Sequence, residues 1–394
     1  MTDLKPDSIW TRTFVLICLS QFFGYAQQSL LSPTFPLYVT QLNGTPFVIG
    51  MVIASFAVTS VIFRPLIGFW ADRWNEAGVL VVGLLLLSAG VLLCLIPSIG
   101  ASMLANSLRG IGWAGLNTGG YSLLALSAPL ERRGEAAGYY TGIQSSVTIF
   151  FPAIALWILQ ASWGGYRTVF LVAVALAAMG AAAGRLLARC VPVRTYGTQT
   201  FVPGAWWKEF FNLMEREVRL PAALLFCLQF SLPAVTSFIV LYAREIGIVN
   251  IGPYFVVNGL VSIFARSLLG RLSDNIGRGR SILAGFALQS LAFILLAAVS
   301  NLAGILISGV LYMLGSAIAH SAILALAMER ANPQRRGRAL ASFSLAFPLS
   351  NGVGALLTGS SLELVGYAWT FLFLAGCAAL GLALTLACRT GLQR

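Results

Sequence analysis

The sequence predicts an all-α membrane protein with about twelve transmembrane helices, arranged as two pseudo-symmetric six-helix bundles. The first observation is composition: of 394 residues, 58% are hydrophobic and only 10% are charged, and the mean hydropathy is +0.84. A soluble domain carries about a quarter charged residues, so most of this chain must face lipid. The second observation is a series of long apolar stretches. The third is a set of motifs that return in the second half at a nearly constant offset.

Each apolar stretch has roughly the 20 residues that a helix needs to cross a bilayer. The first half has six of them, at about residues 13–40, 47–70, 78–98, 102–127, 137–160 and 166–189. The second half has six more, at about residues 221–243, 251–271, 281–299, 302–327, 338–360 and 367–388. We therefore expect one bundle in residues 1–190 and a second bundle in residues 221–394.

The segment between the two predicted bundles, residues 191–220, differs from both in composition. Aromatic and charged residues are interleaved there, among them Trp206, Trp207, Lys208, Glu209, Phe210, Phe211, Glu215 and Arg216. This pattern predicts a short amphipathic helix on the cytoplasmic membrane surface. We expect it to act as a tether that sets the spacing of the two halves.

The distribution of arginines predicts how the chain crosses the membrane. Loops on one side hold Arg73, Arg132, Arg133, Arg185, Arg189, Arg194, Arg216, Arg219, Arg271, Arg278, Arg280, Arg330, Arg335, Arg336 and Arg338. Loops on the other side hold Arg167 and Arg244. Cytoplasmic loops carry the excess of basic residues, so both termini are expected in the cytoplasm of a multi-pass cell-membrane protein, with the bacterial inner membrane as the expected location. The net charge of +12 sits in short loops, so no nucleic-acid partner is expected.

A charged motif occurs twice, at the inner ends of the second and eighth predicted helices. The first copy reads Arg64-Pro-Leu-Ile-Gly68-Phe-Trp-Ala-Asp72-Arg73, and the second reads Arg266-Ser-Leu-Leu-Gly270-Arg-Leu-Ser-Asp274-Asn275-Ile-Gly277-Arg278. An acid at such a place can accept hydrogen bonds from a neighbouring helix N-terminus and pair with a loop arginine. Glycine one turn earlier permits close helix approach. We expect an inner gate made by Gly68, Asp72, Arg73, Gly270, Asp274 and Arg278.

Shorter matches extend the repeat along the chain. Arg133-Gly134-Glu135-Ala136 matches Arg336-Gly337-Arg338-Ala339, and Leu108, Gly112 and Ala114 match Leu311, Gly315 and Ala317, each at an offset of 203. Gly165, Tyr166 and Phe170 match Gly366, Tyr367 and Phe371 at an offset of 201. Such constant offsets indicate two six-helix halves in the same orientation.

These residues resemble the major facilitator superfamily of secondary transporters over essentially the whole chain. The signature loop of the family, G-x-x-x-D-R-x-G-R-R/K, is similar to residues 270–280, with Asn275 in place of arginine. The first copy departs from it after Arg73. The run Leu108-Arg109-Gly110-Ile111-Gly112 resembles the arginine motif of the fourth helix, whereas only Pro152 remains of the glycine-proline run that antiporters carry in the fifth.

The resemblance implies a secondary active transporter that moves a small amphipathic organic solute by alternating access. It is most similar to drug and metabolite exporters, so efflux is expected, with a proton antiporter as one form of it. The alternative is an importer or uniporter of an organic anion bound through Arg109. The family also implies that Asp72 and Asp274 hold the inner gate shut.

Polar side chains inside apolar helices are costly and usually face a cavity or another helix. Several of them recur at helical spacing, which puts them on common faces. The candidate cavity residues are Gln21, Tyr25, Gln28, Arg109, Trp113, Asn117, Tyr140, Gln144, Gln229, Tyr312, Ser316 and His320. Thr148 and Thr236 extend two of these faces. The alternative for each is a hydrogen bond between neighbouring helices.

Coupling to protons stays open at this point. Arg109 is a charge deep in a predicted helix, where it either binds an anionic group, tunes a proton site or is held by helix carbonyls. His320 is the only histidine, and its usual pKa range suits a proton carrier. No acidic residue lies in the middle of a predicted span. Coupling could therefore run through His320, Arg109 or the gate acids Asp72 and Glu135, or be absent.

Other classes of protein are disfavoured. A polytopic membrane enzyme would need a catalytic constellation, and one histidine without clustered acids does not supply it. The six cysteines form no CxxC pair, so we expect neither a metal site nor a cofactor. A channel or a binding-only receptor is a remoter alternative. The expected partners are a small-molecule substrate, the lipid bilayer and a candidate coupling proton, and the expected state is a monomer.

Overall fold

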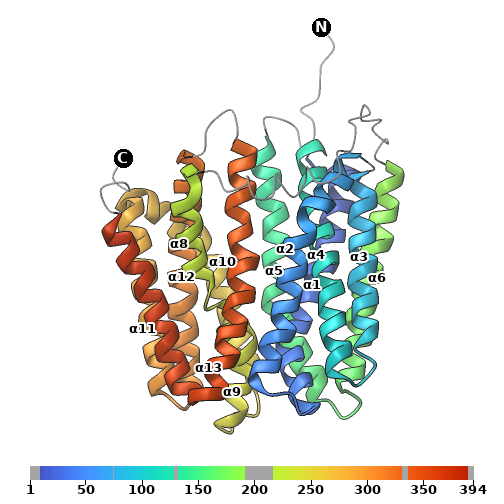
Figure 1. The fold of residues 1–394 in the computed structure, drawn as a ribbon. Helices are drawn as coiled ribbons and strands as arrows, with labels where there is room; N and C mark the ends of the chain where they lie inside the picture. The colour runs from blue at the N-terminus through green and yellow to red at the C-terminus, as the bar shows by residue number, and fades with distance from the viewer. Residues whose placement is uncertain (1–8, 74, 128–131, 191–215, 331–335, 389–394) are drawn as a thin grey trace.

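The computed structural model describes residues 9–73, 75–127, 132–190, 216–330 and 336–388, without the side chains of residues 72–73, 133–134, 216, 266–275 and 336–342. The predicted tether therefore lies almost wholly outside the described residues. All the described secondary structure is helical, and the helices run roughly along one common direction, packed beside and behind one another (Figure 1). The upper end in Figure 1 is where α1 begins, and the lower end is where α1 ends.

The first half consists of six long helices. They are α1 (Arg12–Gln41), α2 (Pro46–Arg73), α3 (Glu76–Leu93), α4 (Ile99–Ser127), α5 (Arg133–Gln160) and α6 (Tyr166–Cys190). Capping side chains explain two of the starts, because Thr11 accepts a hydrogen bond from the Phe14 amide at 3.1 Å and Asn75 accepts one from the Ala77 amide at 2.9 Å. At 30 residues, α1 is about 45 Å long, more than a bilayer core requires.

The second half begins with a helix that is not regular. Its parts are a short 3₁₀ turn (Arg216–Val218), α8 (Arg219–Gln229), the π-helical segment η3 (Ala234–Phe238) and α9 (Ile239–Glu245). The sequence predicts one helix over 221–243, so this interruption is a difference from the prediction. Pro233 lies immediately before η3, and its ring prevents the regular hydrogen bond to the preceding turn.

The remaining helices are α10 (Gly252–Ile276), α11 (Arg278–Ala298), α12 (Leu302–Arg330) and α13 (Arg336–Ala387). The 52 residues of α13 contain both of the last predicted spans, and the chain reverses direction between them at Gly366. That residue has φ 76° and ψ −178°, a conformation that glycine alone adopts readily. The described helices thus account for all twelve predicted spans.

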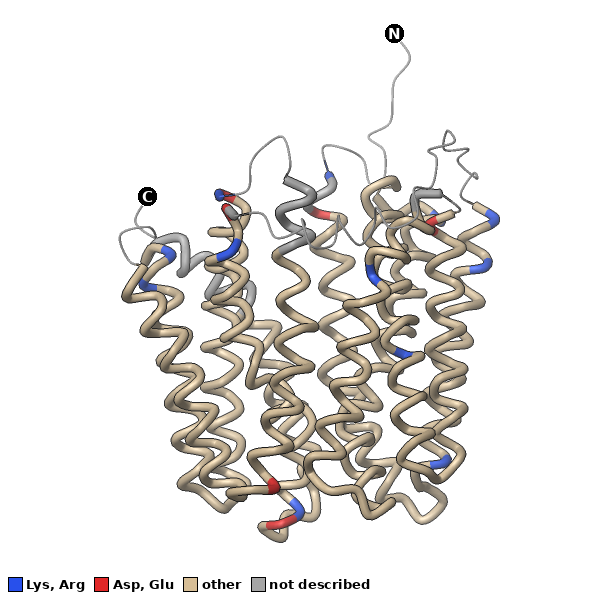
Figure 2. Tube along the Cα trace, viewed as in Figure 1, with Lys and Arg blue, Asp and Glu red and all other residues tan. Residues whose placement is uncertain are grey.

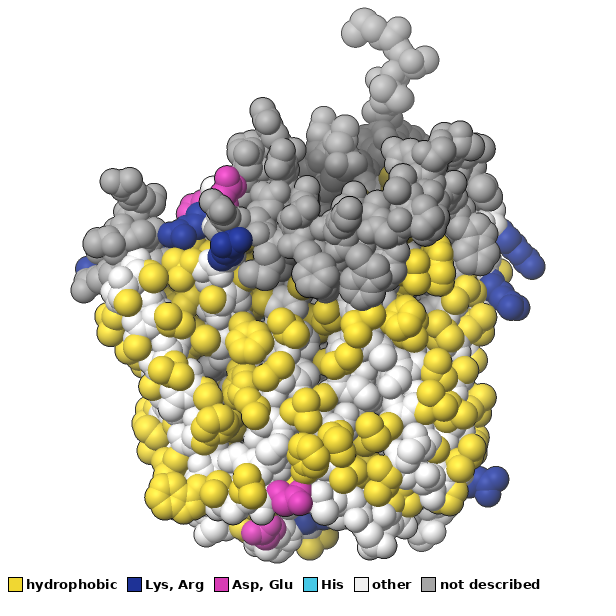
Figure 3. All heavy atoms as spheres, viewed as in Figure 1, with side chains coloured by type: hydrophobic (Ala, Val, Ile, Leu, Met, Phe, Trp, Pro, Cys, Tyr) yellow, Lys and Arg dark blue, Asp and Glu magenta, His cyan; other side chains and the backbone are white. Residues whose placement is uncertain are grey.

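Apolar side chains cover the outside of the helices. Within the described residues, nine helical stretches are long and apolar enough to cross a membrane, with α13 contributing one 45-residue stretch that holds two spans. Figure 3 shows hydrophobic side chains over the visible face between the two ends, and Figure 2 shows most basic residues at the upper end. The predicted all-α membrane fold is confirmed.

Within each half, a pair of glycines lets two neighbouring helices approach closely, and the two pairs lie at equivalent places. In the first half, a Cβ atom on Gly112 of α4 would lie 2.5 Å from the carbonyl oxygen of Gly83 on α3. In the second half, a Cβ atom on Gly315 of α12 would lie 2.6 Å from the carbonyl oxygen of Gly285 on α11. Only glycine fits at such contacts. The same contact at an offset of 202 to 203 residues supports the pseudo-symmetry.

An aromatic cluster at the lower end of the first half closes α1 against α6. The Tyr38 hydroxyl donates to the Cys94 carbonyl at 2.7 Å, and its ring lies 5.4 Å from Tyr166 and 4.9 Å from Phe170. Each residue has an equivalent in the second half. These aromatic contacts, with the buried hydroxyl satisfied by a carbonyl, fix the lower ends of the helices.

The equivalent cluster in the second half is built on Tyr242. Its hydroxyl donates to the Val299 carbonyl at 2.5 Å, and its ring lies 5.1 Å from both Tyr367 and Phe371. Tyr367 and Phe371 repeat Tyr166 and Phe170 at the offset of 201 residues. The internal repeat read from the sequence is therefore also a repeat of contacts.

The two halves meet closely near the lower end, where α2 packs against α13. A Cβ atom on Gly50 would lie 2.6 Å from the Ala355 carbonyl oxygen, and one on Gly359 would lie 2.3 Å from the Pro46 carbonyl oxygen. We call this contact between residues 46–57 and 352–363 the lower seam. Its small residues allow the two backbones to touch.

Polar contacts add to the closure at the lower end. The Glu363 carboxylate of α13 accepts a hydrogen bond from the Phe47 amide at 3.1 Å, in the first turn of α2, where a negative charge interacts favourably with the helix dipole. Gln160 of α5 donates to the Val249 carbonyl at 2.9 Å. These contacts join the first half to the second at the end opposite the start of α1.

Candidate substrate-binding site

Arg109 lies within α4 and is only 2% exposed. One terminal nitrogen donates to the Gln28 side-chain oxygen at 2.5 Å, and the other donates to the Asn106 side-chain oxygen. The guanidinium carbon lies 4.9 Å from the Phe35 ring centroid and 5.6 Å from that of Phe56. Its described contacts are therefore neutral amides and aromatic faces, which stabilise a buried cation without a carboxylate.

Three of these contacts were not expected from the sequence. Asn106 precedes Arg109 by one turn, a spacing that puts the two on one helix face. Phe35 follows Gln28 by two turns of α1, so the same argument could have found it. Phe56 comes from α2, and only the arrangement of the helices brings it to Arg109.

A second group of predicted residues joins α1, α4 and α5. Gln21 donates to the Leu116 carbonyl at 2.9 Å, and Gln144 donates to the Gln21 side-chain oxygen at 3.3 Å. Tyr140 is fully buried beside them. A Cβ atom on Gly120 would lie 2.1 Å from the Gln21 amide nitrogen and 2.4 Å from the Tyr140 hydroxyl oxygen. The structure thus brings Gln21, Tyr140 and Gln144 together as a connection between helices.

A third group has exposed surface. The Tyr25 hydroxyl donates to the Asn117 side-chain oxygen at 2.8 Å, and the Tyr25 ring lies 4.5 Å from Trp113. One turn beyond Asn117, Tyr121 lies 5.2 Å from Tyr140 and is 47% exposed. Tyr121 was not predicted, although its spacing from Trp113 and Asn117 indicates a common face. We call Tyr25, Trp113 and Tyr121 the aromatic wall.

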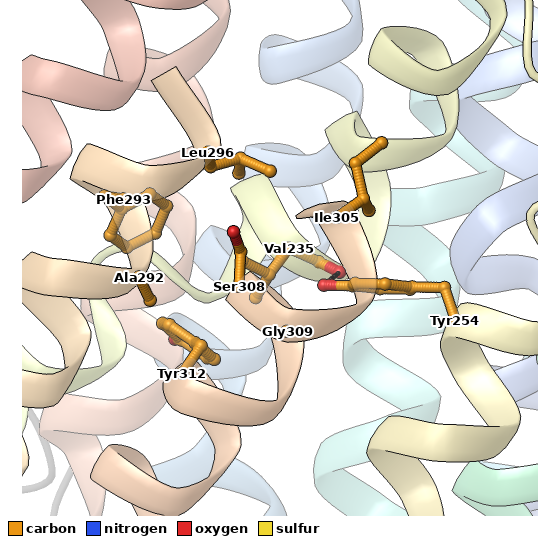
Figure 4. Close-up of a pocket in the computed structure, with 9 residues that line it drawn as sticks. All are labelled: Val235, Tyr254, Ala292, Phe293, Leu296, Ile305, Ser308, Gly309 and Tyr312. Carbon is orange, nitrogen blue, oxygen red and sulfur yellow. Dashed lines mark hydrogen bonds between the residues drawn. The ribbon is translucent and has the colours of Figure 1, made fainter. Parts of the chain in front are cut away.

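The candidates of the second half are less closely connected. Ser231 donates to the Tyr312 hydroxyl at 3.4 Å, and Tyr312 lines a cavity with Tyr254, Phe293 and Ser308 (Figure 4). The cavity has a volume of about 10 Å³, room for about one water molecule and too small for an organic solute. Gln229 is buried, with its side-chain oxygen unbonded. Ser316 and His320 are partly buried further along α12 and do not line this cavity.

The structure describes only some of the residues expected to form the inner gate. The side chains of Asp72, Arg73 and Asp274 and the surroundings of Gly270 lie outside the described residues. Gly68 has open space where a Cβ would stand. Arg278 forms an ion pair with Glu329 of α12, a partner that the sequence did not indicate. The gate therefore stays a prediction.

Comparison with known proteins decides the family. A sequence model described as Major Facilitator Superfamily matches residues 17–280 and again residues 251–391. The chain belongs to the major facilitator superfamily. The first match reaches from within α1 to the start of α11, and the second from the lower end of α10 past the end of α13, so together they cover all the described helices apart from the first turn of α1.

Among curated relatives, this superfamily member is similar to the "Multi-drug resistance efflux pump PmrA" of Streptococcus pneumoniae, at 24% identity over 92% of this chain and 90% of that protein. The "Putative multidrug resistance protein MdtD" of Escherichia coli is 27% identical over 51% of this chain and 41% of that protein. Family and relatives identify the chain as a multi-pass membrane transporter that binds small-molecule substrates within the membrane, and not as an enzyme.

Solved structures of the superfamily share the fold. A bacterial homologue of the human lysosomal transporter Spinster, in an inward-facing and unoccupied conformation, has a TM-score of 0.80 at 16% identity, covering 98% of both chains. The nucleoside transporter NupG has a TM-score of 0.75 at 14% identity, covering 95% of this chain and 99% of that one. At such identities the likeness extends to the fold alone.

Proposed function

We propose that this superfamily member exports a small amphipathic organic solute by alternating access. The observation that carries the proposal is the polar and aromatic cluster built on α1, α4 and α5, in which predicted residues from three helices contact one another inside an apolar bundle. Polar groups at membrane depth are retained where they serve a pathway or join helices. Aromatic and amide side chains suit an amphipathic molecule better than a bare ion.

The moving parts are proposed to be residues 1–190 and 221–394, joined by residues 191–220. The lower seam holds them together at one end of the site, so a solute would enter the space between them from the upper end. Release on the other side would require the contacts of Gly50, Gly359 and Glu363 to separate. Rocking of two repeats about a central site is the motion that such folds support.

Arginine placement supports an orientation with both termini in the cytoplasm. The described inner-loop arginines belong to helix ends at the upper end, and Arg167 and Arg244 belong to the lower end (Figure 2). By the positive-inside rule the upper end is cytoplasmic. This arrangement would make the structure inward-facing, in a bacterial inner membrane, and a monomer contains the whole proposed pathway.

The named relatives bear on the direction of transport, and the buried and titratable candidate residues bear on its coupling to protons. Efflux is favoured because one relative is named as a multidrug resistance efflux pump and another as a putative multidrug resistance protein. An importer or uniporter that binds an organic anion through Arg109 is less favoured, because Arg109 is 2% exposed and both terminal nitrogens are already bonded. His320, Asp72 and Arg109 remain the candidates for proton coupling.

Inside-out membrane vesicles test the proposal directly. Vesicles that contain the protein should accumulate at least one member of a panel of neutral, anionic and cationic amphipathic fluorescent dyes when they are energised. Vesicles without the protein provide the baseline. Nigericin, which collapses the proton gradient, should abolish accumulation if the transporter is an antiporter. Accumulation only in right-side-out vesicles would contradict export and favour the importer.

A further inference from the structure

We infer that the site takes an aromatic organic anion, and that Arg64 on α2, rather than Arg109, holds its charged group. The inference rests on the proposed function, because it names the substrate class of the same site. The observations that support it are the exposed aromatic wall and the open helix face beside Arg64. Neither the family match nor the named relatives assign a role to Arg64.

The aromatic wall offers a surface on which a planar ring can stack. Trp113 and Tyr121 lie two turns apart on α4, and the Tyr25 ring lies 4.5 Å from Trp113. Tyr25 and Trp113 are partly exposed and Tyr121 is 47% exposed, whereas the neighbouring Tyr140 is fully buried. The wall therefore keeps exposed ring surface.

The surroundings of Tyr121 indicate that the exposed surface of the wall is directed toward the inside of the molecule rather than toward lipid. Tyr121 packs against Tyr140 of α5 and lies within electrostatic range of Tyr25 of α1 and Arg64 of α2. With α1, α2 and α5 around it, its exposed side is directed toward the space between the halves. That is where a solute would lie if the halves rock about a central site.

Arg64 is placed to meet the charged group of a ring lying on this wall. It is partly buried and lies within electrostatic range of the Tyr25 and Tyr121 hydroxyls. The α2 backbone is fixed beside α4 one turn earlier, where Thr59 donates to the Ser107 carbonyl at 2.8 Å. One turn later, a Cβ on Gly68 would meet nothing within 4 Å. Among the described residues, the helix face that Arg64 shares with Gly68 is therefore open on this side, and a ligand of this class would use this space.

Arg109 lacks that space. Its terminal nitrogens are bonded to Gln28 and Asn106, and a Cβ on Gly90 would lie 2.7 Å from its Cγ atom. A solute could reach it only by displacing Phe35 or Phe56. Arg109 therefore contributes positive charge to the surroundings, while Arg64 supplies the accessible hydrogen-bond donors.

The charge balance near the wall favours an anion. Of the described acidic side chains, Glu76, Glu135, Glu245 and Glu329 lie within a few residues of a helix end, and Glu363 lies just before the reversal of α13 at Gly366, so all five are at a membrane face. Two of the described arginine side chains lie deeper, those of Arg64 and Arg109. In a low-dielectric site this excess of positive charge stabilises a carboxylate or sulfonate and opposes an ammonium group.

The test uses three matched probes that share the naphthalene ring system and differ in charge: 2-naphthoate, 2-naphthylmethanol and 2-naphthylmethylammonium. Binding to the purified full-length protein in detergent is measured by isothermal titration calorimetry. Naphthoate should bind at least tenfold more tightly than the other two. Arg64→Gln should remove that preference while leaving naphthylmethanol affinity unchanged, and Tyr121→Ala should weaken all three probes. Arg167→Gln, a change at an exposed arginine of the lower end, should leave all affinities unaltered.

Two further measurements keep the result interpretable. If Arg64→Gln does not fold, Arg64→Lys replaces it and should weaken naphthoate alone, since a lysine keeps the charge but not the bidentate fork. Raising the salt concentration should also weaken naphthoate binding selectively. Equal affinity for the three probes, no naphthoate binding, or a preference that survives Arg64→Gln would overturn the inference.

Transport measurements distinguish a failure of this inference from a failure of the proposed function. In proteoliposomes, transport of any solute without an anion preference would leave the transporter proposal standing and remove the Arg64 site. Tight, Arg64-dependent naphthoate binding without naphthoate flux would support the site and count against export of this class of solute.

Discussion

Arg109 is a buried cation whose described partners are all uncharged. Gln28 and Asn106 accept its hydrogen bonds, and Phe35 and Phe56 cover its faces. In the second half, Ser231 corresponds to Gln28 and Tyr312 corresponds to Arg109, each at an offset of 203 residues. These two residues also form a hydrogen bond, at 3.4 Å. One half therefore carries a charge where the other carries a phenol, and the two halves offer a solute different chemistry.

Removing one acceptor of the Arg109 guanidinium should destabilise the fold. Gln28→Leu leaves a charged donor unsatisfied, at a cost of about 2 kcal/mol, so the unfolding temperature in detergent should fall. Combining Gln28→Leu with Arg109→Met should cost less than the sum of the two single changes, because the double variant has no stranded charge. An unchanged melting temperature for Gln28→Leu would show that the bond contributes nothing to stability.

Residue spacing predicted which side chains share a helix face, but not which of them pair between helices. Gln21 with Gln144, Tyr25 with Asn117 and Gln28 with Arg109 were named as candidates and are found together. Phe56 and Arg64 come from α2, and only the placement of α2 beside α4 brings them to the site. In the sequence, Arg64 stands out only as the first residue of the repeated gate motif, so its closeness to the candidate site was not predicted. The roles of all these residues stay predictions.

At the scale of helices, glycine contacts set the distance between neighbours. Gly112 against Gly83 and Gly315 against Gly285 put carbonyl oxygens where any larger residue would have a Cβ. Periodicity predicted the helices themselves, because apolar length is a property of local sequence. It did not predict η3, since a π-helical turn changes the hydrogen-bond register without changing the hydrophobicity.

Alanine at these two glycines should be poorly tolerated. Gly112→Ala and Gly315→Ala force the paired helices apart, which should cost about 1–3 kcal/mol each. Gly376→Ala is the matched control: it lies in α13, is exposed, and its Cβ would meet nothing within 4 Å, so it should be neutral or slightly stabilising. Thermal unfolding of the three variants measures the difference. Equal melting temperatures would mean that the close approach is not needed.

For the whole molecule, the lower seam is the contact whose release transport requires. It consists mainly of small residues whose backbones touch, with a carboxylate at the start of α2. Such a contact is close without being deeply interlocked, so it can form and separate repeatedly. The sequence predicted two halves but gave no sign of which end is closed, because closure depends on contacts between residues about 300 positions apart.

Overfilling the seam should shift the population of conformations. Gly359→Val places atoms within 2.3 Å of the Pro46 carbonyl oxygen and should favour a state that is open at the lower end. Spin labels at Leu42 and Val365, on a cysteine-free background, would report the distance across the seam by double electron–electron resonance. The distance should lengthen in Gly359→Val and stay the same in Gly376→Val. A Gly359→Val distribution identical to that of the parent would argue against the seam as the closed gate.

The π-helical segment has a consequence for comparing the two halves. Gln28 corresponds to Ser231 at an offset of 203, but Tyr38 corresponds to Tyr242 at 204, so one extra residue has entered between them, at η3. One residue turns a helix by about 100°. The widened turn also leaves the Val235 and Thr236 carbonyls able to accept from Tyr254 and Ser32. Any superposition or chimera of the halves must therefore include a one-residue gap there, or every side chain of α9 would be matched to the wrong face.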